Sequence, residues 1–147
     1  MGLEEYWRKR DFMETPEPIG EVKLSEGRIY VVHEHHARHL HYELRLEMDG
    51  VLKSWAVPKT PPTEKGVKRL AVQVEDHPID YAEFEGTIPE GNYGAGIVKV
   101  WDRGSYVMKE IEENKIVFQI NGQKLKGEYC LIRFKGDKNW LFFKVKD

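Results

Sequence analysis

Five of the six histidines of this chain lie within nine consecutive residues, and a carboxylate and a guanidinium follow them at once. Neutral imidazoles and carboxylates supply the nitrogen and oxygen donors that suit manganese, iron or zinc, and a site with few protein ligands leaves positions for water and substrate. So dense a cluster indicates a catalytic metal. The residues are His33, His35, His36, His39, His41, Glu43 and Arg45.

The run from residue 40 to residue 48 alternates between apolar and polar side chains. Successive side chains of a strand point to opposite sides, so this pattern predicts one apolar face and one chemical face. His41, Glu43 and Arg45 share the chemical face. Glu47 lies on the same side, either close to the site or facing solvent, as in most half-buried antiparallel strands. The apolar face comprises Leu40, Tyr42, Leu44, Leu46 and Met48.

We expect three side chains, His35, His41 and Glu43, to hold the metal. A chain that reverses direction between His35 and His41 can bring both imidazoles to one ion. The alternative for His35 is an ordinary surface histidine. His36 and His39 are expected to face solvent.

Arg45 beside a metal points to a phosphoester substrate, because a planar guanidinium can hold two phosphate oxygens at once. The alternative is that Arg45 only pairs with Glu43 or Glu47, which would contribute little net stability. Lys59 and Arg69 flank a proline-rich loop. They either extend a basic rim towards a nucleic-acid backbone or lie on a solvated loop.

The sixth histidine lies in the segment VEDHPIDY. Glu75 and His77 share a face if the strand persists, and Pro78 then stops the ladder. With an ordinary pKa near 6.5, His77 would be partly protonated at neutral pH, and it could protonate a leaving alkoxide or stabilise charge in the transition state. Tyr81 could reach the same pocket. The alternative is a hydrogen-bonded structural histidine.

Short runs rich in Val, Ile, Tyr and Phe must position these side chains, and their spacing predicts an all-β barrel or sandwich. Asp49-Gly50 between two alternating runs predicts a hairpin. Residues 1–20 form a polar arm with one turn of helix, which prolines end. The expected strands are Arg28–His35, His41–Met48, Val51–Val57, Arg69–Glu75, Gly96–Trp101, Lys115–Ile120, Glu128–Phe134 and Trp140–Val145.

Size and composition narrow the classes of protein. A chain of 147 residues fits a single domain, 1–147. The one cysteine, Cys130, cannot form an internal disulfide, and charged residues occupy the place of a secretory signal. We therefore expect a cytoplasmic, monomeric protein with no membrane anchor. A net charge of −2 argues against coating duplex DNA by charge, so any nucleic-acid contact must be local.

These residues together resemble the 3'-phosphoesterase module of bacterial DNA ligase D and its stand-alone bacterial and archaeal relatives. The resemblance runs from about Tyr6 to the C-terminus. It is carried by the segments KRDFMETPEPIG, HEHHARHLHYELRLEMDGVLKSWAVPK and RLAVQVEDHPIDYAEFEGTIPEGNYGAGIVKVWDRGSY, and by a β-rich tail that ends in NWLFFKVK.

The resemblance implies a mainly β fold, a compact antiparallel β-barrel with a polar active-site cavity. It also implies a divalent metal, manganese foremost, with zinc and cobalt as alternatives. The implied activity removes 3'-phosphates and 3'-terminal ribonucleosides, leaving ligatable 3'-hydroxyl ends in repair of broken DNA by non-homologous end joining. The implied partners are nucleic-acid 3' ends and a separate DNA ligase, because no ligase or polymerase segment accompanies this sequence.

Site residues carry over from that family position by position. The implied metal ligands are His35, His41 and Glu43, and the implied phosphate-contacting arginine is Arg45. The implied second histidine and tyrosine are His77 and Tyr81. The implied anion-contacting residues are Ser54, Lys59 and Arg69. The resemblance also implies that the arm, residues 1–20, forms part of the active site through Arg10, Asp11 and Glu17.

Two positions depart from the family pattern. Glu43 stands where the family usually has Asp, a carboxylate one methylene shorter, which alters the geometry around the metal. His33 stands where Gln is common, which places another imidazole near the ion. We expect His33 and Glu75 to lie beside the metal without binding it.

Two other functions compete with this interpretation. A cupin-type metal oxygenase shares some His and Glu spacings, but the interval from His35 to Glu43 is too long, and Gly94 stands where the second cupin histidine belongs. A non-catalytic module that binds DNA ends is the other rival. An intact set of metal ligands argues against it, since such a cluster has no packing value.

Overall fold

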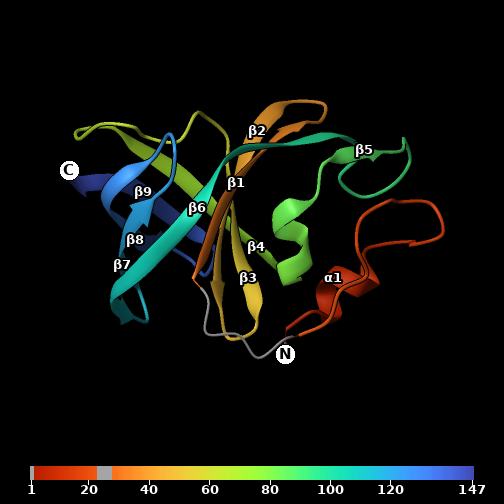
Figure 1. Cartoon of the computed structure of the whole chain (residues 1–147), viewed down its shortest axis with the longest axis horizontal. Helices are drawn as coiled ribbons and strands as arrows, with labels where there is room; N and C mark the ends of the chain where they lie inside the picture. The colour runs from red at the N-terminus through yellow and green to blue at the C-terminus, as the bar shows by residue number, and fades with distance from the viewer. Residues whose placement is uncertain (1, 23–27) are drawn as a thin grey trace.

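The computed structural model describes residues 2–22 and 28–147, and strands dominate it (Figure 1). Within these residues the elements are α1 (Glu4–Arg8), β1 (Ile29–His36), β2 (Leu40–Met48), β3 (Val51–Val57), β4 (Lys68–His77), the 3-10 helix η1 (Ile79–Glu83), β5 (Gly86–Ile88), β6 (Gly96–Glu112), β7 (Lys115–Asn121), β8 (Lys126–Lys135) and β9 (Asn139–Lys146).

The strands form one antiparallel sheet in the order β1-β2-β3-β4-β9-β8-β7-β6-β5. A further pairing between β1 and β6 closes eight of these strands into a barrel, and β5 extends β6 outside the ring. The predicted fold class, a compact antiparallel β-barrel, is confirmed. The edge strands of an open sheet can pair with other chains. Closure removes such edges from the ring.

All eight expected strands are present, but two parts of the chain differ from the prediction. The short strand β5 and the helix η1 were not predicted. The strand β6 was expected to end at Trp101, yet it continues to Glu112. The polar segment DRGS has the composition of a turn, but Gly104 instead lies where a Cβ would be 2.1 Å from the carbonyl oxygen of Asn121. Close backbone contact explains this glycine, so no turn is needed.

The predicted hairpin between β2 and β3 is confirmed. Met48 and Val51 are paired across it, and Asp49 and Gly50 have φ angles of 56° and 81°. Positive φ at both central residues is the conformation that matches the twist of the flanking strands. The hairpin sets the β2–β3 register, in which Arg45 lies opposite Ser54.

The interior of the barrel is apolar. It is filled by alternate residues of the strands. The aromatic rings of Phe118, Phe142 and Tyr129 contact one another there, with Phe118 and Phe142 nearly parallel at 6.3 Å. Small barrels are filled by side chains in this way. The apolar face predicted for β2 supplies Tyr42, Leu44, Leu46 and Met48 to this core.

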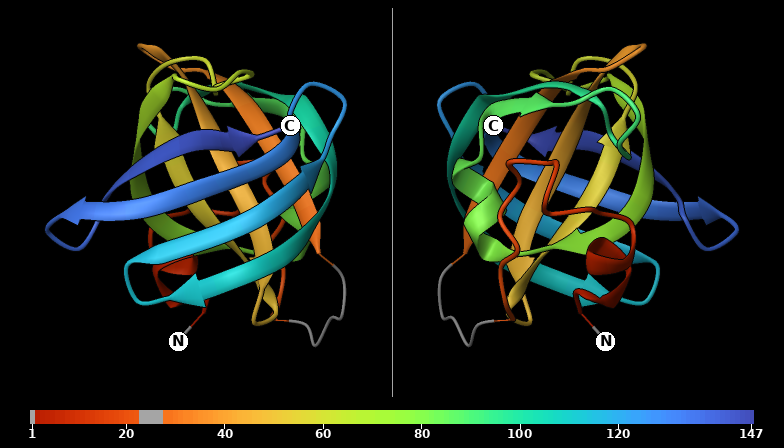
Figure 2. Two further views of the ribbon diagram at one scale, coloured as in Figure 1. Left: turned by 90° about the vertical axis from the view of Figure 1, so that its left-hand side faces the viewer. Right: turned by 90° about the vertical axis from the view of Figure 1, so that its right-hand side faces the viewer.

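The chemical face of β2 points away from this core, on the outside of the barrel wall. It is not open to water, because the N-terminal arm and η1 pack over it, as the right-hand view of Figure 2 shows. A second cluster of buried side chains seals this layer. It includes Leu3 and Tyr6 of the arm, Tyr81 and Ala82 of η1, and Leu52 of β3.

Arg45 and Glu47 are consequently buried, with 0% and 1% of their surface exposed. The solvent-facing alternative for Glu47 is therefore wrong. Its Oε1 atom accepts a hydrogen bond from the backbone N–H of Ile29, 3.0 Å away. Glu47 thus holds the beginning of β1 against β2.

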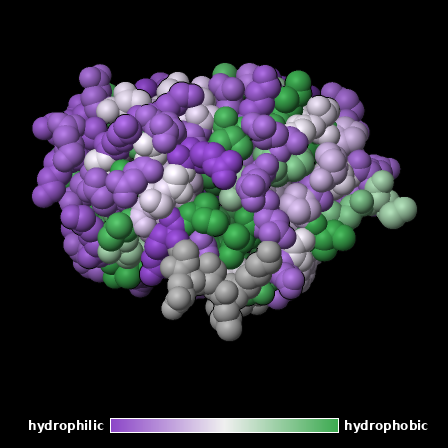
Figure 3. Space-filling model, viewed as in Figure 1, coloured by the Kyte–Doolittle hydropathy of each residue, from purple (hydrophilic) through white to green (hydrophobic). Residues whose placement is uncertain are grey.

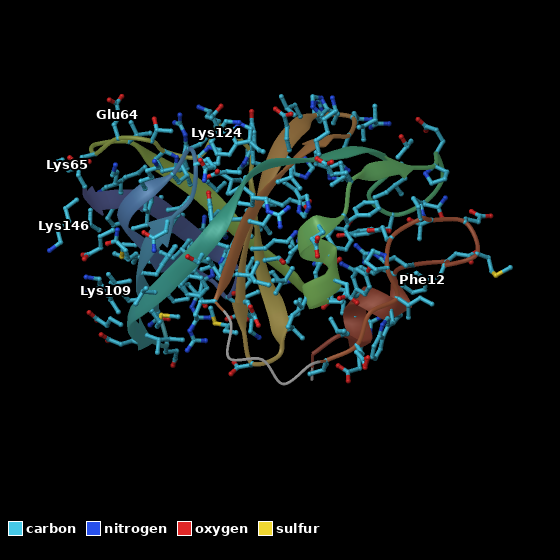
Figure 4. All side chains as sticks on the ribbon, viewed as in Figure 1. Phe12, Glu64, Lys65, Lys109, Lys124 and Lys146 are labelled. Atoms are coloured by element: carbon cyan, nitrogen blue, oxygen red, sulfur yellow. The ribbon has the colours of Figure 1, made fainter. Side chains whose placement is uncertain are left out.

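The outer surface is mostly hydrophilic in Figure 3, with hydrophobic side chains gathered near the middle of that face. Figure 4 places Lys65, Lys109, Lys124 and Lys146 on the barrel side of the molecule, and Phe12 on the opposite side with the arm. Among the described residues, no helix has the length and apolarity needed to cross a membrane.

Candidate active site

The three expected metal ligands converge. Strands β1 and β2 pair with His35 directly opposite His41, so the predicted chain reversal is confirmed. The imidazole centroids lie 4.7 Å apart, and one donor atom from each of His35, His41 and Glu43 falls within 4.8 Å of the others. Within the residues that the structure describes, this is the one group of His, Cys, Asp and Glu with such geometry.

The hydrogen bonds of the two imidazoles fit a cation between them. His35 donates from Nε2 to the carbonyl oxygen of Gly94 (2.8 Å), and His41 donates from Nδ1 to the carbonyl oxygen of His39 (3.2 Å). In the neutral rings the other nitrogens are then acceptors, and both face Oε2 of Glu43, at 3.4 and 3.1 Å. Three acceptors that converge in this way call for a proton or a metal ion.

Orientation of a ligating histidine through its second ring nitrogen is the usual arrangement at protein metal sites. Burial works to raise the pKa of Glu43, but the Arg45 guanidinium and the two imidazoles hold that pKa well below its usual range. Glu43 is therefore an anion at neutral pH. The residues present fit a divalent cation with two nitrogen ligands and one oxygen ligand.

Arg45 lies behind Glu43 and is held by three protein groups. Its Nη2 donates to Oε1 of Glu43, its Nη1 to Oγ of Ser54 (2.9 Å), and its Nε to Nδ1 of His33 (3.0 Å). The guanidinium also lies over the ring of Tyr81, 4.8 Å from its centroid. Arg45 thus fixes one oxygen of Glu43 while the other faces the imidazole pair.

His33 is fully occupied by protein contacts. Its Nδ1 accepts from Arg45, and its Nε2 donates to the carbonyl oxygen of Phe84, 3.1 Å away. Burial, together with the charge of Arg45, lowers the pKa of His33 to about 3. This imidazole is neutral and lies beside the site without turning a ring nitrogen to the ligands.

His77 is also neutral, which corrects the expectation of partial protonation at neutral pH. Burial, and then the positive charges of Arg45 and Arg10, lower the pKa of His77 well below its usual value. Its Nδ1 donates to the carbonyl oxygen of Glu75 (2.9 Å), and its Nε2 accepts from Nη2 of Arg10 (3.3 Å). The sequence could not reveal that the guanidinium groups of Arg45 and Arg10 lie near His77.

The arm joins the site through Arg10 and Glu17. Arg10 donates to Oε2 of Glu17 (3.1 Å) and to Oε2 of Glu75 (3.1 Å), and 4% of its side chain is exposed. Tyr81 donates its hydroxyl to Oε2 of Glu17 at 2.6 Å. Burial raises the pKa of Tyr81 well above its usual value, so the phenol keeps its proton.

These side chains enclose a polar cavity of about 40 Å³. It lies between the barrel wall, the arm, η1 and the loop that follows β5, and not within the apolar barrel interior. Arg45 and Ser54 lie behind its wall. The cavity is lined by Arg10, Glu17, His35, Glu43, Val74, Glu75, His77, Tyr81, Ile88, Tyr93 and Gly94.

Three expected site residues lie elsewhere. Asp11 is exposed, and its Oδ1 atom accepts from the backbone N–H of Met13 (3.0 Å), which stabilises a turn of the arm. Lys59 and Arg69 line a separate hollow of about 220 Å³ together with Pro58, Lys68 and Leu70. Arg69 donates from Nε to the carbonyl oxygen of Thr60, 2.7 Å away.

Sequence reasoning missed four contributors. Gly94 orients His35 through its carbonyl group, and Tyr93 lines the cavity. Lys9 donates to Glu75 (3.3 Å), and Thr15 donates from Oγ1 to Glu17 (2.8 Å). The glycine-rich segment PEGNYGAG was the one available signal for Tyr93 and Gly94. Nothing local distinguished Lys9 or Thr15 from other polar residues of the arm.

Comparison with known proteins agrees with these features. A family model described as the DNA Ligase D 3'-phosphoesterase domain matches residues 33–133. The multifunctional non-homologous end joining protein LigD of Pseudomonas aeruginosa is 53% identical, with 99% of this chain and 19% of that protein covered. LigD proteins of Mycobacterium bovis and Mycolicibacterium smegmatis are each 46% identical, with 99% of this chain and 20% and 21% of those proteins covered. The chain thus spans about a fifth of the length of these relatives.

Proposed function

The chain belongs to the DNA ligase D 3'-phosphoesterase domain family, and from this premise we propose that it is a metal-dependent phosphoesterase that processes nucleic-acid 3' ends. It removes 3'-phosphates and 3'-terminal ribonucleosides during repair of DNA breaks, as the name of its relatives, non-homologous end joining proteins, suggests. The observation that carries the proposal is the convergence of His35, His41 and Glu43 on one point beside two buried arginines.

The proposed metal is divalent, with manganese first because the family resemblance implies it, and the carboxylate of Glu43 is a donor that suits manganese. His35 would hold it through Nδ1, His41 through Nε2 and Glu43 through Oε2, the atoms that face one another. A bound divalent cation supplies charge that stabilises a phosphoryl oxygen and lowers the pKa of a water molecule.

Arg10 is the guanidinium that lines the cavity, whereas Arg45 lies behind Glu43. We therefore assign the first contact with a phosphate oxygen to Arg10. Arg45 positions Glu43 and adds positive charge behind the phosphate. Ser54 supports Arg45 through the 2.9 Å hydrogen bond to Nη1. Charge fixed in place before substrate binds is the most effective electrostatic aid to phosphoryl transfer.

His77 and Tyr81 handle protons in this scheme. Neutral His77 accepts a proton at Nε2 once the phosphate displaces Arg10 from that nitrogen, and the phosphate charge favours the protonated form. It then delivers this proton, taken up from solvent, to the 3' oxygen as a water oxygen forms a bond to phosphorus and the bond from phosphorus to the 3' oxygen breaks. The proton that the water loses returns to solvent. The phenol of Tyr81, held by Glu17, donates a hydrogen bond in the same pocket.

Lys59, Arg69 and Asp11 have more distant roles. Lys59 and Arg69 line their own hollow, so they would contact backbone phosphates remote from the reacting bond. Such contacts weaken with salt, because phosphate binding releases counterions. Asp11 acts through the arm, since its side chain stabilises a turn there.

The test is turnover of a primer-template that carries a 3'-phosphate, with manganese added to protein freed of metal. Phosphate release is expected, and chelation should abolish it. His41→Ala should lose both bound manganese and activity while the circular dichroism spectrum is unchanged. The control is His36→Ala, because His36 is exposed and pairs with Glu34.

Other results would contradict the proposal. Binding of the primer-template without phosphate release would favour a non-catalytic end-binding module. Oxygen consumption would favour a metal oxygenase. A His41→Ala protein that still binds manganese with the original stoichiometry would remove the ligand assignment.

A further inference from the structure

Tyr93 is a half-exposed aromatic side chain on the rim of a polar cavity. It lines the cavity together with His35 and Glu43, yet 47% of its surface is exposed. Its ring belongs to neither of the two clusters of buried apolar side chains among the described residues. Burial in an apolar cluster therefore does not explain an aromatic residue at this position.

The loop that carries Tyr93 also orients a proposed metal ligand. The carbonyl oxygen of Gly94 accepts from His35 at 2.8 Å. Backbone hydrogen bonds from Asn92 to Pro89 (3.3 Å) and from Ala95 to Asn92 (3.1 Å) shape the loop between β5 and β6. Gly94 has a φ of 77°, a conformation that favours glycine. Tyr93 is thus held at a defined place next to the metal ligands.

The arm brings two cations to the same ring. Nζ of Lys9 lies 4.6 Å from the ring centroid, and Cζ of Arg10 lies 5.3 Å from it. Nζ of Lys9 also donates to the hydroxyl of Tyr93 at 3.4 Å. These contacts place two positive charges beside the ring, and positive charge attracts a phosphate-bearing strand.

The volume of the cavity decides what must lie on the rim. About 40 Å³ has room for an ion and a few small groups. Sites that enclose a molecule of nucleoside size begin at roughly 300 Å³. A phosphate that reaches His35 and Arg10 therefore leaves its nucleoside outside, where Tyr93 lies.

We propose that Tyr93 is a stacking platform for the 3'-terminal nucleobase of the strand whose phosphate enters the cavity. The proposal rests on the proposed function for the location of the reacting phosphate. It adds the substrate class: the enzyme prefers ends that carry a base over simple phosphate esters and abasic ends. Stacking tolerates any base, because every base has a π face.

The first experiment measures binding without turnover. The probe is a strand that ends in a 2-aminopurine nucleoside with a 3'-hydroxyl group, the product of the proposed reaction. Manganese-loaded wild-type protein and Tyr93→Phe should quench its fluorescence, because both have an aromatic ring. Tyr93→Leu should not quench it, and its Kd should rise by roughly 5- to 150-fold, the loss expected for one stacked base.

The second experiment measures hydrolysis of 3'-phosphates on an ordinary end and on an abasic end. Tyr93→Leu should raise KM for the ordinary end with little change in kcat. On the abasic end, wild-type and Tyr93→Leu should have the same KM. The control is Phe134→Leu, because Phe134 is 52% exposed on β8 and lies outside the cavity lining.

The outcomes separate this proposal from the proposed function. Two results would overturn the stacking role and leave the proposed phosphoesterase activity standing. One is an equal rise in KM for Tyr93→Leu on the ordinary end and on the abasic end, and the other is quenching that persists in Tyr93→Leu. Quenching that depends on Tyr93 without any phosphate release by wild-type protein would support stacking and overturn the phosphoesterase. Absence of quenching by wild-type protein would overturn the stacking role alone.

Discussion

At the scale of single residues, the site consists of ionisable groups whose charges and proton positions are set by their neighbours. Arg45 holds Glu43, and His35 and His41 are oriented by backbone carbonyl groups. Burial and nearby guanidinium groups keep His33 and His77 neutral. The cluster therefore has the carboxylate of Glu43 facing one ring nitrogen of each imidazole, a donor set that suits a divalent cation.

Arg45→Lys should lower activity on the order of 30- to 1000-fold, a loss of roughly 2–4 kcal/mol in transition-state stabilisation. An ammonium is a point charge and cannot reach His33, Ser54 and Glu43 together. Steady-state rates and manganese titrations would measure the effect, with Arg103→Lys, an exposed arginine on β6, as the control. A lysine variant within threefold of wild type would leave Arg45 with no functional role.

His77 should make stability depend on pH. Its folded pKa is depressed, so the unfolded chain binds the proton first as pH falls. Its contribution to the free energy of unfolding is complete above about pH 6.5. It is lost as pH falls below that value, by at most about 1.4 kcal/mol per pH unit. The free energy of unfolding can be measured with urea, in the presence of a chelator, at pH 7.5 and at pH 5.0. The decrease between the two pH values should be larger for wild type than for His77→Gln. Equal losses would show that His77 does not titrate in this way.

At the scale of elements, the N-terminal arm and η1 form a cover over the outer face of β1–β4. Arg10 and Glu17 of the arm meet Glu75 of β4 and Tyr81 of η1 through hydrogen bonds. These contacts join parts of the chain separated by 65 and 64 residues. The arm is therefore a wall of the cavity.

Glu17→Ala should release the arm. This change takes from buried Arg10 one of its two carboxylate partners and from Tyr81 its acceptor, a loss of up to roughly 3–5 kcal/mol when the rest stays in place. Undocking lets Arg10 regain water, so trypsin should cleave after Arg10 faster while the barrel stays folded. Glu14→Ala, an exposed glutamate of the same arm, is the control. Unchanged cleavage of Glu17→Ala would mean that apolar contacts alone hold the arm.

At the scale of the whole molecule, the barrel separates stability from chemistry. Its interior is filled by apolar and aromatic side chains, whereas the site lies between its outer wall and the cover. A change in the core should therefore alter the free energy of unfolding without altering the ligands. The same separation lets β2 serve both layers, with alternate residues in each.

Phe118→Ala tests this separation. The ring is completely buried and stacks on Phe142. Its loss should cost about 3–5 kcal/mol in the free energy of unfolding, from lost burial and from the cavity left behind. Manganese affinity, measured at a temperature where the variant is folded, should stay within a few-fold of wild type. A large loss of affinity would show that the core and the metal ligands are mechanically coupled.

The sequence alone predicted eight of the strands, the hairpin and the convergence of His35, His41 and Glu43. These features depend on short-range rules: alternation places His41, Glu43 and Arg45 on one face, Asp49-Gly50 sets the turn, and a short reversal brings His35 opposite His41. The family pattern added Arg10 and Glu17 of the arm, which the structure brings to the cavity, and Asp11, which it does not.

Only the tertiary structure decided what surrounds that face. Burial and charge at each position depend on segments that are distant in the sequence, so no local pattern could show that η1 and the arm cover Arg45, or that two guanidinium groups keep His77 neutral. The full length of β6 was hidden because a polar segment with a glycine has the same composition in a turn as at a close backbone contact. The place of Tyr93 at the cavity rim could not be predicted either, because it follows from the path of the chain in three dimensions.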